Sequence, residues 1–264
     1  MSSLQVWAVV YTPPSLGDDL YHRALTCVDD ESQTRIKRFY HREDSCRTLI
    51  GRLLVRTMLK ERGLDPQSLT FGATAAGKPY IVNQASDPPI AYNVTHDNNL
   101  IAMAVAPGKL NPPAFGVGID IMKIRVPGRE TIRSFINTVG DQLTPLEHYL
   151  LKLATSDEER TKIFFWMWTL KEAYTKALGI GLGFDFRRIE FDVANKIVRV
   201  DKRIPPGWRF DMFEITDGDD LYEGVVAEYL GEGETMVTMH NTPEWLMVSD
   251  AATFTENAIN TLHS

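Results

Sequence analysis

One aspartate lies in a segment that otherwise has the pattern of a buried strand. The sequence FGVGIDIMKI ends at Ile124, and strand alternation places Asp120 on the same face as Gly118 and Met122. Burying a carboxylate among apolar neighbours is costly unless a cation or a hydrogen-bond donor meets it. Glycine in a strand also marks places where another group approaches the backbone closely. An exposed edge strand and a functional carboxylate fit this pattern about equally well.

The helix-forming sequence from Lys162 to Leu178, KIFFWMWTLKEAYTKAL, carries a second set of reactive side chains. Trp168, Glu172 and Lys176 are four residues apart and therefore share one helix face. Lys171 projects from a neighbouring face. Glutamate before lysine at this spacing is an ordinary helix pair worth about 0.2–0.5 kcal/mol, and composition alone favours that interpretation. A polar pair on the face of a buried aromatic turn is nevertheless unusual, which makes Glu172 a candidate.

Basic residues concentrate on two successive helical segments of the first half. They are Arg35, Lys37, Arg38, Arg47, Arg52 and Arg56, followed by Lys78 in a Gly-Lys-Pro turn. Because the chain has a formal net charge of −7, an anionic ligand needs such a local positive field. For Lys37 and Arg47 a solvated helix face is favoured. His96, beside a tight turn, could donate to a phosphate, although a lone histidine is more often structural.

Strands and amphipathic helices must hold these residues in place. A strand is predicted at 4–12, a helix at 44–62, a hairpin at 91–106 with its turn at 97–99, a strand at 115–124, a helix at 162–178, and further strands within 188–200 and 210–229. The sequence TPLE, beginning at Thr144, predicts the start of another helix. Each half combines helices with a small, mainly antiparallel sheet, so the fold class is predicted to be α+β.

A proline-rich break from Pro107 to Ala114 divides the chain. We predict an N-terminal subdomain over residues 1–113, a C-terminal subdomain over 114–235, and a peripheral tail over 236–264. With 264 residues, the chain is long enough for each half to bury a core.

The composition excludes several classes of protein. A hydrophobic content of 44% and a charged content of 24% are typical of a soluble globular protein, and the acidic balance disfavours nucleic-acid binding. The two cysteines, Cys27 and Cys46, match no metal-binding pattern, and free thiols are favoured over a disulfide. The sequence has no secretory signal and no apolar run that could span a membrane. We therefore predict a cytoplasmic monomer.

Five sequence motifs follow one another along the chain. FGVGIDIMKI is separated by about fifty residues from WTLKEAYTKALGIGL, which begins at Trp168 and has the form WxxKExxxKxxGxGL. Upstream stand RFYHRED from Arg38, GKPY from Gly77 and YNVTH from Tyr92. Together they resemble, in order and spacing, the motifs of the Sfp-type phosphopantetheinyl transferases. The resemblance covers most of residues 35–190 and implies two similar halves with the active site in the cleft between them.

This resemblance implies an enzyme that transfers the phosphopantetheine group of coenzyme A to a serine of an apo carrier protein. Mg²⁺, or Mn²⁺, would be the cofactor, and adenosine bisphosphate would be released. The implied catalytic residues are Asp120, Glu172 and Lys176, and the first two would hold the metal. The residues implied for coenzyme A are Arg35, Arg52, Lys78, Pro79, His96, Lys171 and Lys176.

One position departs from the bacterial pattern of the family. Bacterial members have a glutamate two residues after the aspartate, where this chain has Met122 and so resembles the eukaryotic branch. A thioether is a poor ligand for Mg²⁺, which prefers oxygen. Our hypothesis is that Asp97, in the hairpin turn beside His96, or a water completes the metal site.

The proposed chemistry needs a base, because a serine hydroxyl is a weak nucleophile at neutral pH. Glu172 is predicted to take the proton, directly or through a water. Two other functions fit the same residues: a Mg²⁺-dependent nucleotide pyrophosphatase, which would cleave coenzyme A without a carrier, and a non-catalytic carrier-protein binder. Carriers of fatty acid, polyketide, peptide and lysine (aminoadipate) biosynthesis all stay open as partners.

Overall fold

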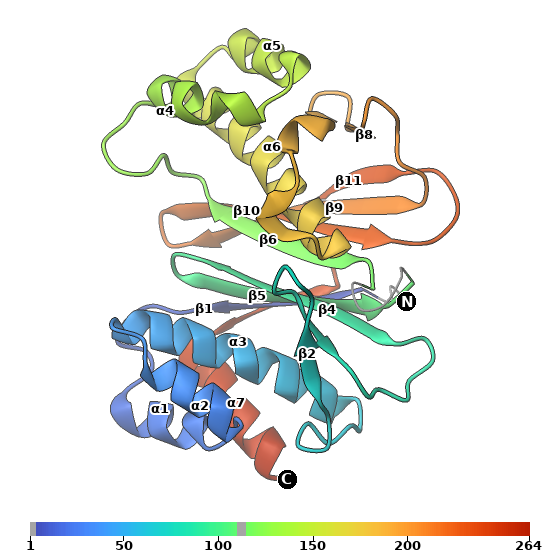
Figure 1. Ribbon diagram of the computed structural model, residues 1–264. Helices are drawn as coiled ribbons and strands as arrows, with labels where there is room; N and C mark the ends of the chain where they lie inside the picture. The colour runs from blue at the N-terminus through green and yellow to red at the C-terminus, as the bar shows by residue number, and fades with distance from the viewer. Residues whose placement is uncertain (1–3, 110–114) are drawn as a thin grey trace.

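A computed structural model describes residues 4–109 and 115–264 of the chain. Figure 1 shows four layers, in which two β-sheets lie face to face and helices cover the outer face of each sheet. Three hydrophobic cores follow from this layering. One lies beneath each helical layer, and the third lies between the two sheets.

The first sheet has the strand order β12-β1-β5-β4. Its strands are β1 (Gln5–Val10), β4 (Ile90–Asp97), β5 (Leu100–Pro107) and β12 (Leu246–Asp250). The helices that share its outer core are α1 (Asp18–Leu25), α2 (Asp30–Lys37), α3 (Arg42–Glu61) and α7 (Ala251–His263). A separate small hairpin of β2 (Phe71–Ala73) and β3 (Pro79–Ile81) carries the Gly-Lys-Pro turn.

The second sheet has the strand order β11-β9-β10-β6. Its strands are β6 (Val117–Lys123), β9 (Trp208–Asp217), β10 (Asp220–Tyr229) and β11 (Met236–His240). The outer layer consists of α4 (Ile132–Val139), α5 (Pro145–Leu153), α6 (Asp157–Leu178) and the hairpin of β7 (Ile189–Asp192) and β8 (Ile197–Val200). Three short 3₁₀ turns connect them: η1 (Gly140–Gln142), η2 (Gly181–Gly183) and η3 (Phe186–Arg188).

Local sequence explains where two of these helices begin and end. The predicted start of α5 is confirmed, because Thr144 and Glu147 each accept a hydrogen bond from the other's backbone N–H in a capping box. The long helix α6 starts five residues earlier than predicted, where the Ser156 side chain accepts from the N–H of Glu159. It ends at Gly179, whose φ of 69° favours glycine.

The two halves repeat one arrangement of a strand, a helix and a hairpin. In the first half these elements are β1, α3 and the β4–β5 hairpin, and in the second they are β6, α6 and the β9–β10 hairpin. In each half the second hairpin strand lies between the other two strands, and both pairings are antiparallel. The fourth strands are not equivalent, since β12 pairs in parallel with β1 and β11 pairs in parallel with β9. The prediction of an α+β fold with two similar halves is confirmed.

Alternation along β6 is as predicted. Val117, Ile119 and Ile121 belong to the core between the sheets. Residues 118, 120 and 122 occupy the opposite face, toward α6, where Met122 packs against the outer core. Asp120 therefore lies on the helix-covered face of the second sheet.

The prediction of a peripheral tail is wrong. Strand β12 pairs with β1 from Val6↔Leu246 to Val10↔Asp250, and α7 contributes Phe254 to the first core. Residues 236–240 instead add the edge strand β11 to the second sheet. Sequence reasoning missed this because parallel pairing with a strand some 240 residues away leaves no local signal. The predicted boundary at 113/114 lies outside the described residues.

Both cysteines are free thiols, as predicted, with Cys46 buried and Cys27 half-buried. Within residues 4–109 and 115–264, every helix is too short or too polar to cross a lipid bilayer.

Candidate active site

The backbone of α6 lies directly against β6 at one glycine. A Cβ atom added at Gly118 would lie 2.2 Å from the carbonyl oxygen of Ala173 and 2.3 Å from the amide nitrogen of Ala177. Only glycine permits this approach, as the sequence pattern suggested. The contact places the last two turns of α6, which carry Glu172 and Lys176, beside Asp120.

Asp120 and Lys176 form an ion pair in this junction. Lys176 donates from Nζ to Oδ1 of Asp120 at 2.6 Å and to the hydroxyl of Thr95 at 3.0 Å. The Thr95 hydroxyl in turn donates to the same carboxylate oxygen at 3.1 Å. Asp120 is buried, with 6% of its surface exposed, and burying a carboxylate is costly without hydrogen-bond donors. Thr95 of the first half and Lys176 of the second half offset this cost together.

The two carboxylates of the site repel each other. Burial raises the pKa of Asp120, while the Lys176 ammonium and the Thr95 hydroxyl oppose the rise. The pKa of Glu172 is also raised, first by burial and then by the negative charge of Asp120. Glu172 is half-buried on the same helix as Lys176. A basic carboxylate next to a fixed anion and a fixed cation is suited to proton transfer and to cation binding.

These residues fit a divalent cation whose ligands come partly from the protein and partly from a substrate. Both hydrogen bonds that the Asp120 carboxylate accepts from the described residues end on Oδ1. Within the described chain no three acidic, histidine or cysteine side chains converge as a complete metal site. Mg²⁺ is usually held by one or two carboxylates together with substrate phosphates and waters, so the Asp120–Glu172 pair supplies a sufficient number.

A row of side chains on β4 joins the two sheets at this edge. Asn93 accepts from the backbone N–H of Ile119 at 2.9 Å, and Asp97 accepts from the backbone N–H of Lys123 at 2.7 Å. Thr95 lies between them and reaches Asp120. Alternation places all three on one side of the strand. Asp97 is therefore close enough to Asp120 for its charge to raise the pKa of that group, while one of its oxygens already binds backbone.

A pocket of about 790 Å³ opens beside this cluster, between the two halves. Its walls are the turn before β3, part of β4, the last turns of α6 and the glycine-rich segment after α6. The lining residues are Ala75, Ala76, Gly77, Lys78, Pro79, Asn93, Val94, Glu172, Thr175, Lys176, Gly179, Ile180, Gly181 and Gly183. Four residues predicted from sequence are thus brought together here: Lys78, Pro79, Glu172 and Lys176.

The other predicted cations lie farther out on the first half. Arg35 is exposed at the end of α2, and Arg52 is half-buried on α3. Neither side chain forms a hydrogen bond or an ion pair with the described part of the chain. His96 is exposed, and its pKa is lowered by partial burial and by the positive charges of Arg47 and Lys176. None of these three side chains lines the pocket.

Comparison with known proteins agrees with this geometry. Residues 14–108 match the family model described as 4′-phosphopantetheinyl transferase, N-terminal, and residues 116–224 match that of the 4′-phosphopantetheinyl transferase superfamily. The chain is 44% identical over 263 residues to the 4′-phosphopantetheinyl transferase pptA of Paxillus involutus, covering 98% of this chain and 100% of that protein.

The chain belongs to the 4′-phosphopantetheinyl transferase superfamily. It is 32% identical to the L-aminoadipate-semialdehyde dehydrogenase-phosphopantetheinyl transferase of Xenopus laevis, over 67% of this chain and 57% of that protein. It is 34% identical to the 4′-phosphopantetheinyl transferase of Bacillus subtilis, over 64% of this chain and 67% of that protein. The predictions of a transferase and of the eukaryotic-like branch are confirmed.

The second family signature contains a lysine that does not face the pocket. Lys171 is fully buried on the other side of α6, where Nζ donates to the Glu147 carboxylate at 2.7 Å and to the carbonyls of Gln142 at 3.0 Å and Phe186 at 3.2 Å. The prediction that Lys171 contacts coenzyme A is therefore wrong. Helical spacing put it on a neighbouring face, and packing turned that face toward α5 and the segment before β7.

Sequence reasoning also missed three residues of the transferase site region. Thr95 and Asn93 carry the junction between the halves, and alternate polar residues in the YNVTHD strand were the available signal. Glu147 was recognised only as a helix start. Its carboxylate also accepts from the backbone N–H of Phe191 at 3.0 Å and thus holds α6, α5 and β7 together.

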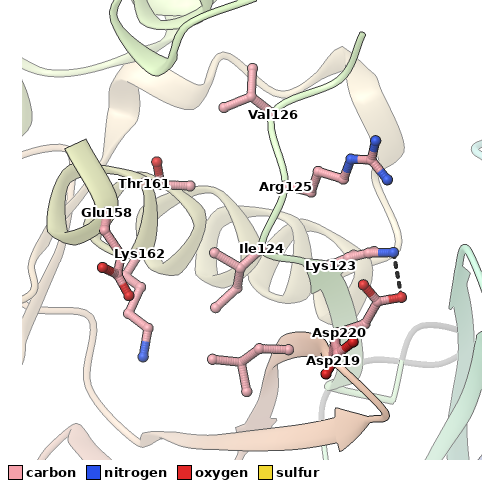
Figure 2. Close-up of a pocket in the computed structure, with 10 residues that line it drawn as sticks. Lys123, Ile124, Arg125, Val126, Glu158, Thr161, Lys162, Asp219 and Asp220 are labelled. Carbon is pink, nitrogen blue, oxygen red and sulfur yellow. Dashed lines mark hydrogen bonds and ion pairs between the residues drawn. The ribbon is translucent and has the colours of Figure 1, made fainter. Parts of the chain in front are cut away.

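A second hollow, of about 400 Å³, lies beyond the end of β6. Figure 2 shows Lys123 paired with Asp220 on one side of it, while Glu158, Thr161 and Lys162 of α6 lie on the opposite side. Its lining contains none of the site residues predicted from sequence. The mixed charges leave no net field for an anionic ligand, so the pocket between the halves remains the candidate active site.

Proposed function

We propose that this transferase moves the phosphopantetheine group of coenzyme A to a serine hydroxyl of an apo carrier protein, in a Mg²⁺-dependent reaction. The observation that carries the proposal is the Asp120–Lys176–Glu172 cluster at the wall of a pocket between the two halves. The names of the relatives support the group transferred. The donor, the acceptor and the metal are our inference.

Glu172 is the proposed base. It lines the pocket, and burial together with the Asp120 charge raises its pKa, so it holds a proton more readily than an ordinary glutamate. The serine oxygen attacks the phosphorus on the pantetheine side of the pyrophosphate, and its proton passes to Glu172 directly or through a water. The bond from this phosphorus to the bridging oxygen of the pyrophosphate breaks, and adenosine bisphosphate departs with the electron pair.

Lys176 stabilises the charge that develops during this step. Its ammonium is fixed between Asp120 and Thr95, so it requires little reorganisation when negative charge grows on the phosphoryl oxygens. A Mg²⁺ ion held by Asp120 and Glu172 would add charge neutralisation at the pyrophosphate. We keep Asp97 as the candidate third ligand, since its charge acts on Asp120. Mn²⁺ would serve in place of Mg²⁺.

The pocket dimensions and its two lining lysines, Lys78 and Lys176, fit coenzyme A. A volume of about 790 Å³ lies within the range of about 300–1,000 Å³ that is usual for small-molecule sites. Pro79 and the glycine-rich segment after α6 offer apolar walls and accessible backbone. Arg35, Arg52 and His96 are proposed to meet the phosphates that project toward the first half.

The test is to incubate the protein with coenzyme A, Mg²⁺ and an apo carrier domain, and then to weigh the carrier by intact mass spectrometry. The carrier mass should rise by one phosphopantetheine, and the gain should require coenzyme A, the metal and the carrier serine. A chelator and a carrier with serine replaced by alanine are the controls. Fatty acid, polyketide, peptide and aminoadipate-pathway carriers are tested side by side.

The same experiment separates the two alternatives. Release of adenosine bisphosphate without any carrier would identify a nucleotide pyrophosphatase. Carrier binding with no mass change would identify a non-catalytic binder. Titration of Mg²⁺ with Asp97→Ala tests the third ligand, and an unchanged metal requirement would remove Asp97 from the site.

A further inference from the structure

The last carbonyl groups of α6 take part of their hydrogen bonds from the other half of the molecule. A helix leaves its final four carbonyls without partners in the helix. The N–H of Gly179 donates to the carbonyl of Thr175 at 3.0 Å and to the carbonyl of Lys176 at 3.2 Å. The carbonyl of Ala177 accepts instead from Nζ of Lys78 at 3.0 Å. The carbonyl of Gly179 accepts from the hydroxyl of Thr74 at 3.2 Å.

Both donors come from one tight turn between β2 and β3. The backbone N–H of Thr74 donates to the carbonyl of Lys78 at 2.9 Å, and the N–H of Lys78 donates back to the Thr74 hydroxyl at 3.1 Å. Gly77, with φ of 86°, closes the turn. The turn therefore presents the two side chains together, as a preformed cap. We define these residues, 74–78, as the capping turn.

Lys78 also joins the strand that carries Asp120. Its Nζ donates to the carbonyl of Val117 at 2.7 Å, so one ammonium holds the first residue of β6 and the last turn of α6 at once. Lys78 is 7% exposed, and burial lowers its pKa to about 7. Holding a lysine in such a place is costly, and a phosphate contact at the protein surface would not need it.

The geometry points to a positioning role for Lys78 and Thr74: they cap the catalytic helix from the opposite half and so set the distance of Glu172 and Lys176 from Asp120. A cation near a helix C-terminus also interacts favourably with the carbonyl dipoles. This inference rests on the proposed function only for its kinetic consequence. The cap itself is a property of the free protein.

The alternative is that Lys78 is a coenzyme A phosphate ligand, since it lines the pocket. The two roles differ in what they predict for Thr74, which does not line it. If Lys78 only binds a phosphate, its removal should leave α6 unchanged, and substitution of Thr74 should have no effect. A cap requires both side chains and acts on the helix end even when no ligand is present.

Three variants test the inference. Lys78→Met keeps the apolar stem and removes the donors, and Thr74→Val keeps the shape and removes the hydroxyl. Lys152→Met is the matched control, because Lys152 is exposed in the last turn of α5. Amide hydrogen exchange over residues 175–180 is measured on the free protein. Turnover and KM for coenzyme A are measured with an apo carrier.

In Lys78→Met we expect exchange at 175–180 to accelerate by about tenfold and kcat to fall by about tenfold, with KM for coenzyme A within about twofold. Thr74→Val should change exchange and kcat in the same direction by about threefold. Unchanged exchange in both variants would overturn the inference, as would a KM that rises about tenfold with kcat unchanged. If the native protein transfers nothing to any carrier, the proposed function fails, while the exchange measurement still decides the cap.

Discussion

The two halves share a strand, a helix and a hairpin, yet they bring helix and sheet together differently. In the first half α3 lies over β4 and β5, and a Cβ added at Gly51 of that helix would meet the side chains of Val94 at 3.4 Å and Ile101 at 4.0 Å, both ordinary contacts. In the second half α6 lies over β6 and β10, with its backbone against Gly118. Side chains thus separate the helix from the sheet in the first half, whereas in the second half the helix backbone contacts the strand backbone directly.

This difference separates the chemistry of the halves. The close contact brings polar side chains of α6 to the buried carboxylate of β6. On the helices of the first half Arg35 is exposed, Arg52 is half-buried, and the buried Arg56 pairs with Asp29. The two halves therefore share one fold, but only the close approach of α6 to β6 allows the second half to carry the buried acid–base cluster. The predictions that follow test this contrast, beginning with the largest expected effect.

Gly118→Ala should have the largest combined effect on stability and turnover. Its Cβ would lie within 2.3 Å of helix backbone, which cannot rotate away as a side chain can. We expect a loss of stability of about 3 kcal/mol and a fall in turnover of about 100-fold, because α6 must move outward. Chemical denaturation and the carrier mass assay measure both.

Gly51→Ala is the matched variant in α3. The added methyl meets only ordinary contacts, and alanine is the better helix former, so stability should stay equal or rise by up to about 1 kcal/mol. Equal effects of the two substitutions would contradict the contrast between the halves.

Lys171→Met should destabilise the protein by about 3–5 kcal/mol, because it leaves the Glu147 carboxylate buried without its cation. The affinity for coenzyme A, measured by calorimetry at a temperature where the variant is folded, should be unchanged. Adding Glu147→Gln should restore part of the stability, because it removes the unpaired buried charge; its single amide oxygen can still accept from one of the two backbone N–H groups, that of Thr144 or that of Phe191. A Lys171→Met protein of normal stability but weak coenzyme A affinity would return Lys171 to the ligand site.

Glu172→Gln should lower kcat by about 100-fold, or about 2.7 kcal/mol on the barrier, while coenzyme A still binds. The amide keeps the shape but cannot take a proton. Arg52→Gln is the variant of the first half with which Glu172→Gln is compared. That change should raise KM for coenzyme A and leave kcat nearly intact. Near-normal turnover by Glu172→Gln would refute its role as the base.

Glu223 should give the stability of the protein an unusual pH dependence. This β10 carboxyl is fully buried, and neither of its oxygens is hydrogen-bonded to residues 4–109 or 115–264. Burial, with the charge of Glu214, raises its pKa to about 10 despite nearby Lys162. The unfolded group titrates near pH 4.5. Between these values the folded state binds the extra proton, so this group lowers stability as pH rises.

Glu223→Met should therefore raise stability by about 1–3 kcal/mol near neutral pH and flatten its decline toward pH 9. Thermal unfolding from pH 5 to pH 9 measures the change. Glu214→Gln, on the partly exposed neighbour, is the control and should have little effect on the slope. An unaltered slope in Glu223→Met would mean that another group sets the alkaline limit.

The sequence by itself determined the family, the fold class and the faces of single elements. Alternation placed Asp120 opposite the inter-sheet core, and helical spacing joined Glu172 to Lys176, because these periods are local properties of strand and helix. The tertiary structure alone decided which faces meet. It turned Lys171 away from the pocket, paired β12 with β1, and brought Thr95 and Lys78 across to the second half. Contacts between residues distant in the chain depend on packing of whole surfaces, which no short sequence pattern records.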